Sequence, residues 1–154
     1  MRRTLGAILG FLAVVAAVLP LCGLAAAGSE VQEGVGFVAL DIFVNAGPAS
    51  LGAYQVELKA DAGSAKVVGI EGGEHAAYAQ PPYYDPAALH EDQLKERIIL
   101  AAFSTGPELP SGRTRVARIH VRIVGEATYK AAVMTAGAAD GTKVEATVQV
   151  VPVR

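Results

Sequence analysis

The chain has one cysteine, no tryptophan and few charged residues, and each shortage excludes a class of protein. Cys22 by itself can neither build a disulfide scaffold nor supply the cysteine ligands of a zinc finger or an iron–sulfur site. Charged residues make up 18% of the 154 residues, and the formal net charge is −2. Because nucleic-acid binders normally carry a basic balance, nucleic acid is not an expected partner.

Catalytic sequence motifs are also missing. The chain has no Gly-x-Ser-x-Gly, no Ser-x-x-Lys and no His-Glu-x-x-His, which are the local patterns of several hydrolase classes. Ser104 and Ser111 lie in expected turns with no base next to them in the sequence. We therefore expect a protein that is not an enzyme and has no cofactor.

The positive mean hydropathy, +0.37, comes largely from the first 27 residues. Arg2 and Arg3 precede an almost wholly apolar run over residues 5–19, and the small residues 25–27 follow. This order is typical of a secretory signal peptide. We expect a signal helix in residues 1–27, cleavage after Ala27, and export to the periplasm, the cell surface or the medium.

Two alternatives remain for the N-terminal segment. Residues 4–27 are long enough to span a bilayer, so the segment could be an uncleaved anchor and the chain's only membrane contact. Cys22 could be lipidated, although the bulky Leu21 before it does not suit a bacterial lipoprotein signal. Cleavage would leave residues 28–154 as one domain of 127 residues with a net charge of −4, since Arg2 and Arg3 are lost.

Alternation of apolar and polar residues dominates the chain from Val35 onward and predicts β-strands. The most regular stretches carry their apolar residues at 54, 56 and 58 and at 117, 119, 121 and 123. Turns are expected at 61–64 and at 139–142, where Asp-Gly favours a hairpin. The strands are expected at 35–44, 54–59, 66–70, 97–103, 117–123, 127–135 and 144–150. Such spacing predicts an all-β, two-sheet antiparallel β-sandwich of the jelly-roll type with about seven to nine strands.

Residues 71–96 interrupt the alternation and hold three of the five tyrosines. Long connections in compact domains are functional or disordered, and the prolines and tyrosines of this segment favour one long ordered loop. Asp85 followed by Pro86 predicts the start of a short helix. The candidate binding residues are Tyr78, Tyr83, Tyr84, Asp85 and His90. The alternative is that this loop covers an open edge and that its rings cap the core.

Two further groups of polar residues could bind a ligand. His75 and His90 could hold a divalent metal with nearby carboxylates, but a solvated polar loop fits better, so no metal site is predicted. The arginines at 113, 115, 118 and 122 form a basic stretch. Alternation places only Arg118 and Arg122 on a common face, and a surface charge pattern that limits edge pairing is the simplest interpretation. The more specific interpretation is that these arginines bind an anionic partner.

Several stretches resemble cohesin domains. Residues 52–61 and 67–71 are similar to two early strands of that family, residues 98–104 to the strand of the next core layer, and residues 112–124 to the strand after it. The resemblance covers about residues 35–150 and consists mostly of hydrophobic patterning. It implies a jelly-roll sandwich, related to carbohydrate-binding modules, that binds a protein partner on one sheet face without catalysis.

Three functional hypotheses follow from these observations. The first is an exported, non-catalytic, cohesin-like module that binds a protein in the cell envelope or outside the cell. The second is a carbohydrate-binding module that contacts a polysaccharide through the loop tyrosines, although the absence of tryptophan weakens its platform. The third is a metal-assisted enzyme that uses the loop over residues 74–92.

Overall fold

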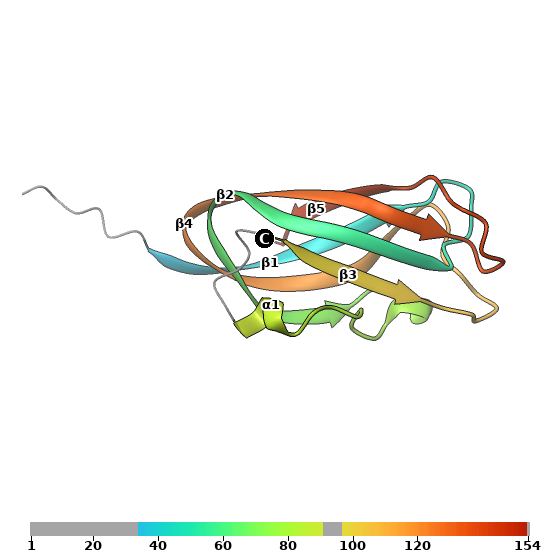
Figure 1. Ribbon diagram of the computed structural model, residues 1–154, viewed down its shortest axis with the longest axis horizontal. Helices are drawn as coiled ribbons and strands as arrows, with labels where there is room; N and C mark the ends of the chain where they lie inside the picture. The colour runs from blue at the N-terminus through green and yellow to red at the C-terminus, as the bar shows by residue number, and fades with distance from the viewer. Residues whose placement is uncertain (1–33, 91–96, 154) are drawn as a thin grey trace, which may run out of the picture. The chain divides into compact units, whose positions relative to one another are not determined.

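Residues 34–90 and 97–153 are described by a computed structural model (Figure 1). The predicted signal segment, residues 1–27, lies outside them. No helix among the described residues is long and apolar enough to cross a membrane. The elements in chain order are β1 (Val35–Asn45), β2 (Ala53–Gly72), the 3-10 helix η1 (Ala76–Tyr78), α1 (Ala87–His90), β3 (Ile98–Phe103), β4 (Arg113–Gly137) and β5 (Thr147–Pro152).

The five strands form one antiparallel sheet in the order β3-β2-β4-β1-β5. The longest strands are β2 and β4, and β2 pairs with β4 along its whole length, from Ala53 opposite Gly137 to Gly72 opposite Ala117. β3 pairs with the first half of β2, whereas β1 pairs with the first half of β4 and carries β5 on its other side. The all-β, antiparallel part of the predicted fold is thus confirmed.

The long strands bend sharply at one end of the domain, so that the two halves of the sheet face each other (Figure 1). The pairing of β2 with β4 shifts register around Ala62, which marks the bend. Gly63 and Gly125 take positive φ angles of 79° and 69° there. A Cβ atom on Gly63 would lie 2.0 Å from the backbone oxygen of Glu126. Glycine is required at residue 63 on both counts, because other residues rarely adopt this conformation.

The expected number of strands is wrong, since the described residues hold five strands in a single hydrogen-bonded sheet. The turn predicted at 61–64 lies inside β2, and the expected break between the strands 117–123 and 127–135 lies inside β4. Asp61 and Gly63 indicated a chain reversal at the first of these positions. They instead accommodate bulges, which bend a continuous strand and increase its twist.

The apolar core lies between the two facing halves. Val56 and Leu58 of β2 and Leu40 and Ile42 of β1 are fully buried, together with Ile119 of β4. These residues are the apolar members of the alternating pattern, so one side of each strand faces inward. Burying a side chain of this size stabilises the fold by about 1.5–3 kcal/mol. The core fixes which side chains of each strand face outward, and the outward ones form the candidate surfaces.

Candidate binding surfaces

The loop tyrosines, predicted to form one binding site, have different surroundings. Tyr78 is only 2% exposed and packs edge-on against Tyr54, with ring centroids 5.2 Å apart. Its hydroxyl donates a hydrogen bond of 2.6 Å to the backbone oxygen of Leu51. Burial raises the pKa of Tyr78 to about 12. Tyr78 therefore caps the core, as the alternative interpretation of the loop expected, and is unavailable to a partner.

Tyr83, in contrast, lies on the surface at the edge of the sheet. Its backbone N–H donates to the Ala101 oxygen (2.7 Å) and its oxygen accepts from the Ala101 N–H (2.9 Å), which extends the sheet beyond β3. Tyr83 is 71% exposed and Phe103 65%. The two rings lie nearly parallel, 11° apart in plane, with centroids separated by 6.4 Å. The segment thus both covers an edge and presents an aromatic pair.

The remaining loop candidates are not part of this pair. Tyr84 is half-buried and packs against the core. The Asp85 carboxylate accepts a hydrogen bond of 2.9 Å from the Ala87 N–H, so the predicted start of a helix is confirmed as α1. His90 is the last residue of α1, and its side chain lies outside the described part. The five candidates therefore do not converge on one site.

The described residues offer no metal site of the kind considered above. They contain no group of three or more His, Cys, Asp or Glu side chains placed to hold an ion. The Nδ1 atom of His75 accepts a hydrogen bond of 3.2 Å from the Ala77 N–H and so caps η1. Glu91 and Asp92, the nearest carboxylates to His90 in the sequence, lie outside the described residues.

Tyr83 and Phe103 border a larger surface, here called the apolar face, which is the outer side of β3, the first half of β2 and the second half of β4. Met134 adds a third exposed large side chain. Between these side chains lie alanines of three adjacent strands, at 53, 101 and 132. Ion pairs between Arg97 and Glu57 (3.0 Å) and between Lys130 and Asp61 (2.7 Å) also lie along these strands.

The opposite outer surface, formed by β1, β5, the first half of β4 and the second half of β2, is here called the basic face. Phe43 pairs with Arg115 and Ile42 with Ala117, so Val116 is an extra residue, a β-bulge in β4. Val116 and Ala117 are both fully buried. The side chains that face outward along β4 are therefore Arg113, Arg115, Arg118, His120 and Arg122.

The prediction that only Arg118 and Arg122 share a face is therefore wrong. A bulge adds one residue, which reverses the alternation beyond it and brings odd-numbered and even-numbered side chains to one side. The prediction that the arginines protect an edge also fails, because β4 lies between β1 and β2 in the sheet. The consecutive apolar residues Val116 and Ala117 were the sequence signal for the bulge.

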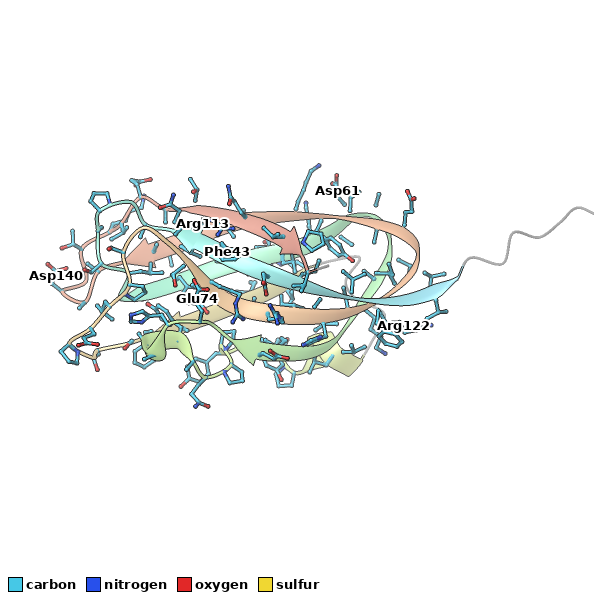
Figure 2. All side chains as sticks on the ribbon, turned by 180° about the vertical axis from the view of Figure 1, so that it is seen from behind. Phe43, Asp61, Glu74, Arg113, Arg122 and Asp140 are labelled. Atoms are coloured by element: carbon cyan, nitrogen blue, oxygen red, sulfur yellow. The ribbon has the colours of Figure 1, made fainter. Side chains whose placement is uncertain are left out.

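Most of these cations have partners on neighbouring strands. Arg118 donates two hydrogen bonds to Asp41, 2.7 and 2.9 Å long, which lower the pKa of that carboxyl and raise that of Arg118. The Arg113 guanidinium lies 3.4 Å from the centre of the Phe43 ring (Figure 2). The His120 and Glu71 side chains are 2.6 Å apart. Arg113, Arg118 and His120 thus each have a partner side chain on β1 or β2.

Comparison with protein-family models, curated proteins and solved structures found no match to this chain. The resemblance to cohesins therefore rests on the sequence patterns described above. Sequence reasoning also missed Phe103 and Met134 as surface residues. Phe103 ends the apolar run of the strand expected at 97–103, and that strand, β3, lies at the sheet edge.

Proposed function

We propose that this chain is an exported, non-catalytic binding module with a cohesin-like, jelly-roll sandwich fold, and that it contacts a protein partner. Three features support the proposal: the signal-like N-terminal sequence, the absence of catalytic motifs, and a bent sheet whose halves enclose one core. The partner is expected in the cell envelope or outside the cell, where the segment would direct the chain.

The composition of the apolar face is the observation that carries this proposal. This face holds three exposed large side chains, Tyr83, Phe103 and Met134, together with the alanines at 53, 101 and 132, and Gln55 lies opposite Ala101. Tyrosine, phenylalanine and methionine are enriched at protein interfaces, whose centres lack charge and whose rims are polar. The Arg97–Glu57 and Lys130–Asp61 ion pairs supply charged groups on the side of this face nearer the bend.

A polysaccharide is the second candidate partner, because the nearly parallel rings of Tyr83 and Phe103 could stack on sugar rings. Aromatic residues offer apolar ring faces, and tyrosine adds a polar hydroxyl. We place it second because a strip of two rings uses only one edge of the apolar face. A protein would also cover Met134 and the alanines.

Site-specific photocrosslinking in the native cells tests the proposal. A photoreactive phenylalanine analogue is placed at residue 103 or 83, and at residue 145 as the control, since the Glu145 side chain is 89% exposed and lies off the apolar face. We expect protein adducts of the same mass from residues 103 and 83 and none from residue 145. Replacing Met134 by Glu should reduce the adduct at residue 103, because a charge would enter the contact.

Three results would contradict the proposal. One is the same adducts from residue 145 as from residue 103. Another is no protein adduct from either aromatic position. The third is loss of the residue 103 adduct when purified envelope polysaccharide is added, together with saturable glycan binding that Y83A and F103A abolish, which would establish the polysaccharide instead. Both alanine variants should fold normally, since surface substitutions usually change stability by no more than about 0.5 kcal/mol.

A further inference from the structure

The basic face ends, at the bend, in a cluster that the ion pairs above do not include. Arg122 of β4 lies directly opposite Phe37 of β1 on one side and Lys66 of β2 on the other. Phe37 is 73% exposed, Val35 57% and Val68 48%. We call these five residues the terminal patch. It joins two cations to three exposed apolar side chains.

The two cations of the terminal patch lack acidic partners among the described residues. Neither Arg122 nor Lys66 makes an ion pair within residues 34–90 and 97–153. Three acids of β1 and β2 pair with other cations: Asp41 with Arg118, Glu71 with His120 and Asp61 with Lys130. Like charges directly opposite each other in a sheet are destabilising. A bound anion would offset the repulsion between Arg122 and Lys66, so this pair points to an anionic ligand.

The apolar part of the terminal patch narrows the class of ligand. Phe37 and its neighbouring valines would remain in water if only a soluble anion bound to Arg122 and Lys66. An anionic lipid surface satisfies both parts, because phosphate groups meet the cations and the ring enters the interfacial region below them. Figure 2 shows Arg122 near the end of the domain where β1 begins, and Asp140 near the other end.

The position of the terminal patch along the chain favours the same ligand. Val35 lies only eight residues after Ala27, the last residue of the apolar N-terminal segment. Eight residues span at most about 28 Å when fully extended. A chain that inserts or passes its N-terminal segment through a bilayer thus brings Phe37 and Arg122 close to that bilayer's surface. We propose that the terminal patch docks the domain on an anionic membrane.

The absence of tryptophan makes this proposal directly measurable. F37W puts a single tryptophan in the terminal patch of the full chain, and F103W puts one on the apolar face as a matched control. Each protein is mixed with vesicles of phosphatidylcholine alone or of phosphatidylcholine with phosphatidylglycerol. We expect the F37W emission to move to shorter wavelength and to be quenched by brominated acyl chains only in the anionic vesicles. F103W should respond to neither vesicle.

Charge reversal tests the role of the two cations. K66E and R122E introduced together into F37W should weaken the anionic-vesicle response by at least about tenfold, since each basic residue near such a surface contributes to binding. K59E, which reverses a lysine of the other half of β2, should leave the response unchanged. If the double reversal does not fold, K66Q with R122Q serves the same purpose. Circular dichroism and thermal unfolding confirm that the variants compared are folded.

Several outcomes would overturn the proposal. They are an F37W response of equal size without phosphatidylglycerol, an equal response from F103W, or no response of F37W to either vesicle. An F37W shift produced by soluble polyglutamate in the absence of vesicles would assign the patch to an acidic protein instead. The outcomes measured with F37W do not bear on crosslinking at residue 103, so this inference and the proposed function can fail separately.

Discussion

At the scale of single residues, Asp41 organises the cations of the basic face. Its side chain is 15% exposed and accepts both hydrogen bonds from Arg118, while the Nε atom of Arg115 lies 3.8 Å away. The hydrogen-bonded guanidinium of Arg118, with further attraction from Arg115, holds the pKa of Asp41 below its ordinary value of 3.8. The ionised carboxylate is therefore stabilised more in the folded chain than in the unfolded one.

We predict that D41N lowers the free energy of unfolding at neutral pH by about 1–3 kcal/mol, because the hydrogen bonds to a charged group are weakened. The Asp41 contribution is complete above its unfolded pKa and is lost as the pH falls through the lower folded value. Urea unfolding of wild type and D41N from pH 7 down to about pH 2 should show the gap narrowing below about pH 4.

The surface variant E145Q provides the control for this pH series. The Glu145 side chain is 89% exposed beside Lys143, and exposed ion pairs contribute little. Its unfolding curve should follow the wild type at each pH. A gap between wild type and D41N that stays constant through the acid range would show that Asp41 does not stabilise the fold through its charge.

At the scale of elements, the bend in β2 and β4 decides the fold. Gly63 combines a positive φ of 79° with a backbone contact that leaves no room for a Cβ atom. Gly112 also has a positive φ, 65°, but nothing lies within 4 Å of its Cβ position. A side chain at residue 112 would therefore incur only the conformational cost of a positive φ, whereas a side chain at residue 63 would also incur a steric cost.

We predict that G112A lowers the free energy of unfolding by about 1–2 kcal/mol, the cost of a left-handed residue with a Cβ atom. G63A should cost at least about 2 kcal/mol more, because the Glu126 carbonyl must move and overpacking adds its own strain. Urea unfolding followed by circular dichroism measures both variants. Equal losses in the two would mean that the bend can relax around residue 63.

The bend also shows where sequence analysis succeeded and where it failed. Alternation at Tyr54, Val56 and Leu58 correctly gave the strand and its buried side, because burial on one face imposes a period of two. The bulge at Val116 could not be placed by the same rule, since it breaks the period that the rule uses. Tyr78 and Tyr83 belong to the same loop, and their contacts with distant residues, Leu51 and Ala101, determine which of them is buried.

At the scale of the whole domain, the continuity of β2 and β4 joins the two halves of the sheet. Two separate sheets would be linked by loops and by packing alone, so either could open while the other stayed folded. Here both halves share two strands whose pairing runs from Ala53 opposite Gly137 to Gly72 opposite Ala117. If one half opened, the core side chains of both halves would lose their packing against each other. We therefore expect a single cooperative unit.

Hydrogen exchange at increasing urea concentration tests this expectation. The most protected amides should lie in β4, which has β2 and β1 as neighbours in the sheet, and the least protected strand amides in the edge strand β5. The slowest amides of residues 114–123 and of residues 128–135 lie on opposite sides of the bend. They should have the same opening free energy and the same dependence on urea, because they exchange through global unfolding. A lower opening free energy for all of residues 128–135 would instead reveal a half that unfolds alone, which the shared strands should prevent.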